Sequence, residues 1–157
     1  MYLNIEELNS PIEINEKLLF HIAETILNDY YDDDIPDFTI TFVEPEKIKE
    51  LNRNFRNVDA VTDVLSFESD GEIDPETGKE YLGDIVICVD QAKNQAEQSG
   101  HSLDNEIALL VIHGVLHLLG YDHANDEQRE EMWKYQNAYL EQCGIKLNRR
   151  PGEDFDF

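Results

Sequence analysis

Apolar residues recur along this chain with two different periods, and the period predicts which segments form helices and which form strands. Between residues 15 and 27, apolar positions return every three or four residues, which is typical of a helix with one buried face, and Asn15 can cap its start. Similar patterns and capping residues place further helices at 45–54, 90–99, 102–119 and 125–143. Short stretches rich in β-branched and aromatic residues predict strands at 2–5, 38–43, 64–67 and 83–89.

The order of these elements predicts an α+β fold. Strand, helix, strand and helix are followed by two strands separated by an acidic, turn-rich loop, which favours a β-hairpin, and then by three helices. We therefore expect a single domain in which a small mixed β-sheet packs with about five helices. A length of 157 residues suits one such domain. Its expected extent is 1–147, followed by a polar C-terminal tail at 148–157.

One predicted helix is apolar nearly all round and yet carries two histidines. Between residues 107 and 119, every residue is apolar except His113, Gly114 and His117. Such a helix should be buried, and buried imidazoles need partners because unpaired polar groups are costly inside a protein. The two histidines are four residues apart and share one helix face. Gly120 can end the helix in a left-handed turn that returns His123 to the same point. We expect a metal site on this buried helix and the following loop.

The type of metal site follows from the residue beside the first histidine. Three imidazoles with an open fourth position form a catalytic zinc site. The spacing His-x3-His-x2-Gly-x2-His matches that of the metzincin proteases, which have a glutamate directly after the first histidine as general base. Here that position is Gly114, which argues against a peptidase of this type. Asp122 is the nearest acid in sequence, and its position is more typical of a solvated loop residue.

A wider set of motifs resembles the YbeY family of bacterial metal-dependent endoribonucleases. The similarity extends over residues 38–143. The motifs that carry it are Leu51-Asn52-x-x-Phe55-Arg56, Asp59, the run Thr62-Asp63-Val64-Leu65-Ser66-Phe67, the run Leu82-Gly83-Asp84-Ile85-Val86-Ile87-Cys88, and the segment from His113 to His123.

The resemblance implies a site and a biological role. It implies one Zn²⁺ per chain, bound by His113, His117 and His123, and a part for Arg56 in activity. It also implies cleavage of single-stranded RNA in maturation of the 16S rRNA 3′ end and in ribosome quality control. The expected partners are precursor rRNA and the ribosome or its proteins, and DNA is not expected.

Three departures from the family pattern stand outside the expected metal ligands. The segment 58–61 lacks the basic residue and the Asp-x-Pro that usually precede the Thr-Asp-Val motif. Glu68 stands where a proline often follows the Ser-Phe pair. Gln136 stands where a glutamate is common in the last helix.

The composition of the chain argues against nucleic-acid binding and favours a cytoplasmic location. The chain has 12 Lys and Arg against 35 Asp and Glu, a net charge of −23, whereas nucleic-acid binding usually depends on basic surface. One basic cluster, Lys47, Lys49, Arg53 and Arg56, is interleaved with acids as on a solvated helix face, and a second comprises Lys146, Arg149 and Arg150. Two cysteines, without a signal peptide or an apolar run of membrane-spanning length, favour the cytoplasm.

Two other functions are compatible with the residues. One is a metal-dependent hydrolase acting on another substrate, such as a peptide or small amide. The other is a non-catalytic, ribosome-associated protein with a structural zinc, which would need a fourth protein ligand to close the site. The hydrolytic metal site rests on the histidine spacing itself, whereas the RNA substrate rests on the family resemblance.

Overall fold

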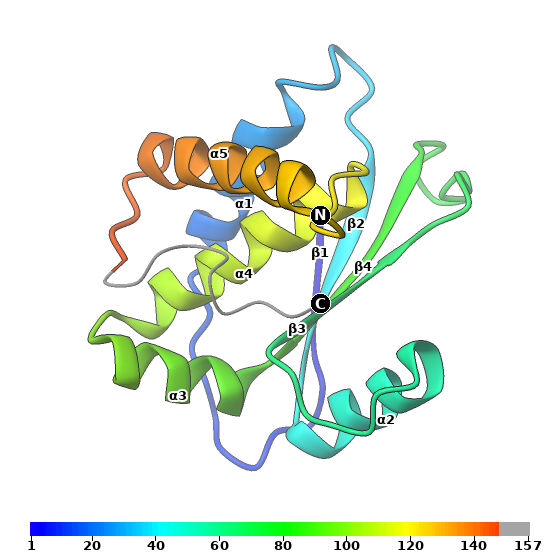
Figure 1. Cartoon of the computed structure of the whole chain (residues 1–157). Coiled ribbons are helices and arrows are strands. Elements are labelled where there is room, and N and C mark those ends of the chain that lie inside the picture. The colour runs from blue at the N-terminus through cyan, green and yellow to red at the C-terminus, as the bar shows by residue number, and fades with distance from the viewer. Residues whose placement is uncertain (148–157) are drawn as a thin grey trace.

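A four-stranded mixed sheet forms the centre of the protein in a computed structural model, which describes residues 1–147 (Figure 1). Its strands are β1 (Tyr2–Ile5), β2 (Asp37–Val43), β3 (Val64–Glu68) and β4 (Tyr81–Cys88). They are arranged in the order β1-β2-β4-β3. β1, β2 and β4 are parallel, and β3 pairs with β4 in the antiparallel sense as the predicted hairpin. The predicted α+β class with a mixed sheet is confirmed.

The five helices cover the two faces of the sheet unequally. The helices α1 (Glu16–Leu27), α3 (Val89–Ser99), α4 (Leu103–Leu118) and α5 (Asp126–Gln142) gather on one side, with α4 in contact with the other three and with β3 and β4. α2 (Pro45–Arg56) lies against the other face, where it contacts β3, β4 and α3 (Figure 1). None of the helices within residues 1–147 combines the length and apolar character needed to cross a bilayer.

The ends of several elements differ slightly from the prediction. α2 runs to Arg56 rather than residue 54, because Asn57 adopts a left-handed conformation (φ 59°) and ends the helix there. Val89 begins α3 instead of ending β4, and Asp37 belongs to β2. The proposed polar tail at 148–157 lies outside the described residues, so the expected division of the chain stays a prediction.

Close contact between α4 and β4 places the histidine helix directly on the sheet. A Cβ on Gly114 would lie 2.8 Å from Cδ1 of Ile85 and 2.9 Å from its Cγ2. These separations are too short for any side chain, so glycine lets the helix backbone approach the strand. The residue that replaces the metzincin glutamate is therefore turned towards the sheet, where a glutamate could not be accommodated without displacing the helix.

Candidate metal centre

The last turns of α4 and the loop after it bring three histidine side chains together. One ring nitrogen each from His113, His117 and His123 lie within 4.8 Å of one another. The Nε2 atoms of His113 and His117 are 3.0 Å apart. The ring centres of His113 and His117 are 4.5 Å apart, and that of His123 lies 5.0 Å from the His117 ring. The structure thus assembles the three histidines that the sequence singled out.

Local sequence accounts for this convergence. Four-residue spacing puts His113 and His117 on one face of α4, whose start is capped by the Ser102 side chain. Gly120 has the left-handed conformation predicted for it (φ 103°), which turns the chain after the helix. In the loop, Asp122 Oδ1 accepts a hydrogen bond of 2.7 Å from the backbone N–H of His123. The turn and this hydrogen bond direct the third imidazole back towards the helix.

A buried glutamine on α5 orients the first histidine. The Nδ1 of His113 is hydrogen-bonded to Oε1 of Gln136, and both side chains are buried. A carbonyl oxygen can only accept, so His113 donates from Nδ1 and its Nε2 carries the lone pair. That lone pair belongs to the nitrogen that lies beside His117. Gln136 therefore selects the tautomer in which Nε2 of His113 can bind a metal.

The surroundings of His117 keep it neutral. Burial is the main cause that lowers the pKa of His117 to about 4, and the nearby His123 and Arg56 act in the same direction. Asp122 and a hydrogen bond with the backbone of Tyr121 oppose the shift without reversing it. Because only the neutral imidazole has a lone pair to donate, this environment holds His117 in its metal-binding form at neutral pH.

The donor set fits a small divalent metal ion. With Zn–N bonds of about 2.0–2.1 Å in a tetrahedron, two ligand nitrogens are separated by roughly 3.3 Å, close to the observed 3.0 Å. Three imidazoles are a known catalytic zinc ligand set. Within residues 1–147, no fourth His, Cys, Asp or Glu joins the group. A tetrahedral ion held by these three residues would keep one position for water or substrate.

Arg56 lines the same cavity as His117. The cavity has a volume of about 190 Å³. Its lining residues are Arg56, Ser66, Glu68, His117, Gly120, Tyr121 and Asp122. Arg56 reaches it from the end of α2 and donates a hydrogen bond of 2.8 Å from Nη2 to the carbonyl oxygen of Ser66. Arg53, from the same basic cluster, faces Asp59 at 3.9 Å, and neither it nor Lys49 lines the cavity.

Sequence reasoning did not single out several residues of this site. Asp122 is exposed in the loop, as expected, and it also lines the cavity, as does Glu68 from β3. Gln136 was noted only as a departure from a family pattern, although it contacts His113. The signal for Gln136 was present, because a long polar side chain sits among the buried positions of α5, but sequence alone does not show which histidine it meets.

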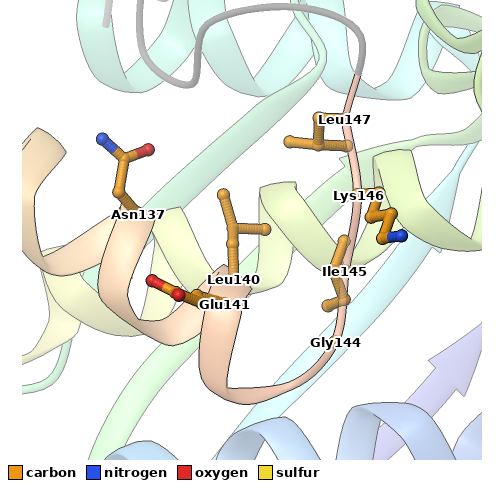
Figure 2. Close-up of a pocket in the computed structure, with 7 residues that line it drawn as sticks. All are labelled: Asn137, Leu140, Glu141, Gly144, Ile145, Lys146 and Leu147. Carbon is orange, nitrogen blue, oxygen red and sulfur yellow. The ribbon is translucent and has the colours of Figure 1, made fainter.

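A second cavity, at the end of α5, lacks comparable chemistry (Figure 2). It has a volume of about 340 Å³. Its lining residues are Asn137, Leu140, Glu141, Gly144, Ile145, Lys146 and Leu147. Among these, Glu141 and Lys146 are the ionisable side chains, and the metal-binding group lies elsewhere. The histidine cavity is therefore the stronger candidate for catalysis.

Comparison with known proteins agrees with the motifs. A family model described as Endoribonuclease YbeY matches residues 4–144. A protein named endoribonuclease YbeY from Staphylococcus carnosus is 45% identical over 116 residues, which cover 72% of this chain and 76% of that protein. One from Bacillus cereus is 40% identical over 154 residues, covering 92% and 99%.

A solved structure shares the fold over nearly its whole length. The solution structure of a Thermotoga maritima protein superposes with a TM-score of 0.60 at 31% identity, covering 98% of this chain and 97% of that one. The family match extends from β1 to the end of α5 and includes the three histidines, Arg56 and Gln136. The chain therefore belongs to the endoribonuclease YbeY family and is an enzyme of the nuclease class.

Proposed function

We propose that this protein is a zinc-dependent endoribonuclease that cleaves single-stranded RNA, and that it acts in maturation of the 16S rRNA 3′ end and in ribosome quality control. The observation that carries the proposal is the shared cavity. His117 and Arg56 come from elements far apart in sequence, and both line it. A metal-dependent nuclease has to bring a metal ion and a positive charge to one phosphodiester, and this cavity is lined by a candidate metal ligand and an arginine.

The histidine ligands would hold the metal, and other side chains would act on the phosphate. When bound, Zn²⁺ supplies Lewis-acid activation of a water molecule or of a phosphoryl oxygen. The Ser66 carbonyl engages Nη2 of Arg56 and so orients the guanidinium plane. The remaining N–H groups of Arg56 can bind two phosphate oxygens and stabilise the charge that grows on them during cleavage. Gln136 keeps the His113 ring in the tautomer that this arrangement needs.

Two carboxylates are placed to hold or move protons. Asp122 and Glu68 line the cavity together with Arg56 and His117. One oxygen of Asp122 accepts from the His123 backbone, which leaves its second oxygen for substrate or water. A general base must lie within hydrogen-bond reach of the proton that it removes. We assign this task to the carboxylates of the cavity, because the sheet excludes one at position 114.

The alternatives are less well supported by the geometry. A metzincin-type peptidase needs its base glutamate next to the first histidine, where Gly114 contacts Ile85 too closely for a side chain. A structural zinc site would be closed by four protein ligands, and the part of the chain that the structure describes offers three. A metal held by three protein ligands would keep a position for water or substrate, which favours turnover.

The test combines metal analysis with cleavage of a defined RNA. We expect about one zinc per chain and metal-dependent cutting of a labelled single-stranded RNA. His117→Ala should lose both. Arg56→Ala should keep its metal and lose most cleavage, because arginine is not a zinc ligand, and Arg56→Lys should recover only part of it.

Arg53→Ala is the matched control, since Arg53 lies on the same helix and is more than half exposed. It should cleave as the unaltered protein does. Full metal content in His117→Ala, or full cleavage by Arg56→Ala, would overturn the assignment. The rRNA role is tested separately with precursor 16S RNA in ribosomal particles, where the 3′ extension should be removed.

A further inference from the structure

The sheet face opposite α4 carries a groove that is separate from the cavity lined by Arg56 and His117, which we call the metal cavity. Its volume is about 370 Å³. It is lined by Asn4, Glu6, Thr41, Val43, Leu51, Phe55, Phe67, Asp84 and Val86. α2 covers one end of this face, through Ile48 and Leu51, and the groove lies beside it. Parallel strands are normally covered on both faces, so an accessible groove over β1, β2 and β4 calls for an occupant.

Two phenylalanines form an aromatic wall of this groove. Phe55, on the last turn of α2, exposes 67% of its surface, the largest fraction among the exposed large hydrophobic residues of the described chain. Its ring meets that of Phe67 edge-on, with centres 5.4 Å apart and planes at 68°. An exposed aromatic ring held by a second ring is preorganised for stacking on a flat partner, because little side-chain freedom remains to be lost on binding.

The groove and the metal cavity are lined by neighbouring residues of β3 and of α2. Consecutive residues of one strand point to opposite faces, so Ser66 lines the metal cavity while Phe67 lines the groove. On α2, likewise, Phe55 lines the groove and Arg56 lines the metal cavity. The guanidinium carbon of Arg56 lies 6.0 Å from the centre of the Phe67 ring. A phosphate bound by Arg56 would therefore have the base of an adjacent nucleotide near the aromatic wall.

The polar groups of the groove suit a base and disfavour a phosphate. Glu6 and Asp84 present carboxylates, which repel phosphate and accept hydrogen bonds from the amino groups of bases. Asn4 and Thr41 add neutral hydrogen-bonding groups. None of the groove's lining residues is basic, in contrast to the metal cavity with its arginine. The division of charge between the two sites matches the division between base and backbone in a nucleotide.

We propose that this groove binds one nucleobase of the single-stranded RNA substrate by stacking on Phe55, next to the phosphate held by Arg56. The proposal rests on the proposed function, since it specifies how the same site selects unpaired RNA. A base inside a duplex is stacked and paired and cannot enter the groove. Stacking is also independent of phosphate charge, which would let an acidic protein gain RNA affinity without basic surface.

The experiment measures binding of the zinc-loaded protein to a labelled single-stranded 2′-O-methyl RNA, whose integrity is checked after each titration. Phe55→Ala should weaken binding about fivefold or more, the range for loss of one stacked base, whereas Phe55→Tyr should bind normally. Phe20→Ala is the matched control, because Phe20 is 48% exposed on α1 and lies outside both sites. In cleavage assays, Phe55→Ala should raise KM more than it lowers kcat.

Two further readouts separate stacking from a loss of structure. The slope of log affinity against log salt should be unchanged in Phe55→Ala, whereas Arg56→Ala should make it shallower by about 0.7, the contribution of one phosphate contact to a single strand. Removing the base from one position of the RNA should weaken binding to the unaltered protein. The same abasic RNA should bind Phe55→Ala no more weakly than the intact RNA does, because the two changes remove the same contact.

Each failure has a distinct meaning. If Phe55→Ala binds RNA as Phe20→Ala does, or if every abasic position adds its full loss to that of Phe55→Ala, the groove does not bind a base. If sedimentation shows a dimer that Phe55→Ala dissociates, a second copy of the chain occupies the groove and the proposal is wrong. If the zinc-loaded unaltered protein neither binds nor cleaves single-stranded RNA, the proposed function itself fails.

Discussion

Gln136 is a neutral amide at a position where a charged carboxylate would act differently on the metal site. Its Oε1 holds Nδ1 of His113, and its side chain is fully buried. The Nε2 of Gln136 is also buried and has no hydrogen-bond partner within the described residues. A buried amide half satisfied in this way is kept at some cost in stability, which points to a functional reason for its presence. That reason is the orientation and tautomer of His113.

The first prediction removes this contact. Gln136→Leu should leave α5 folded but weaken zinc affinity about 10- to 100-fold, the usual effect of losing an outer partner of a ligand histidine. Gln136→Glu should retain tight binding, because a carboxylate also accepts from Nδ1. Affinity is measured by competition with a chromophoric chelator. Asn137→Leu, an amide substituted at an exposed position of the same helix, should bind zinc normally. Equal affinity in both leucine variants would contradict the role given to Gln136.

The second prediction concerns pH and the metal-free protein. The pKa of His117 is lowered from 6.5 to about 4 in the folded protein, chiefly by burial. Between these values the unfolded chain binds a proton that the folded protein does not. The free energy of unfolding should therefore fall as the pH is lowered from about 6.5 to about 4, and this contribution should be complete below pH 4.

Urea unfolding of chelator-treated protein at several pH values measures this effect. Other groups titrate over the same range, so the informative quantity is the difference from His117→Gln, which cannot take up the proton. That variant should lose less stability than the unaltered protein between pH 6.5 and 4. Parallel curves for the two proteins would show that His117 titrates normally and is not buried as described.

At the scale of elements, the packing of α4 on β4 sets the position of the metal ligands. Gly114 follows His113 directly, so any change in the distance between helix and strand displaces the histidine pair. Ile85 fills the space beneath Gly114 with three of its side-chain carbons, all within 3.0 Å of where a Cβ would be. With Ile85 in place, the helix can therefore sit at this depth only with glycine at position 114.

The third prediction tests this packing. Alanine at a helix interior is normally favoured over glycine by about 0.8–1.0 kcal/mol, whereas overpacking a core costs about 1–3 kcal/mol. We expect the cost of overpacking to exceed the gain in helix propensity, so that Gly114→Ala lowers the free energy of unfolding by about 1–2 kcal/mol and weakens zinc binding. In an Ile85→Ala background the new methyl group fills vacated space, and Gly114→Ala should then be neutral or stabilising. A stabilising effect in the unaltered background would contradict the close contact.

Sequence predicted local features of these elements better than their contacts. The cap at Asn15 forms as expected, and Ser102 and Asn125 cap the helices predicted to begin at 102 and 125, because a capping side chain bonds within a few residues of itself. The hairpin of β3 and β4 and the left-handed Gly120 also follow from nearby residues. The insertion of β4 between β2 and β3 depends on pairing across many residues, which no local pattern encodes.

In the candidate site, too, sequence predicted features within one short segment better than contacts between distant residues. The three histidines share one short segment and were predicted from spacing. Gln136 lies 23 residues from His113, and its contact depends on how α5 packs across α4. Arg56 was assigned through family resemblance, because its residue type and helix position alone are those of a solvated surface residue. Tertiary packing, which sequence periodicity does not specify, brings it to the cavity beside His117.

At the scale of the whole molecule, charge opposes the approach of RNA. The net charge of −23 produces a repulsive field around the protein, and the cavity adds one arginine against two carboxylates. Affinity must then come from short-range contacts: the metal, the guanidinium of Arg56 and the aromatic wall of the groove. Such contacts act only after the RNA has crossed the repulsive field. The net charge should therefore affect the rate constant of association more than the affinity of the final complex.

The fourth prediction follows from this separation of rate and affinity. Basic nucleic-acid-binding proteins associate more slowly as salt is added, because attraction is screened. Here the long-range force is repulsion, and raising the ionic strength from about 0.01 M to 0.15 M shortens its range from about 30 Å to about 8 Å. The association rate constant with single-stranded RNA should rise over this range, while dissociation also accelerates through loss of the Arg56 contact. Stopped-flow fluorescence on the zinc-loaded protein measures both rates. An association rate that falls steeply with salt would mean that RNA is steered by a basic surface that the residues of this site do not provide.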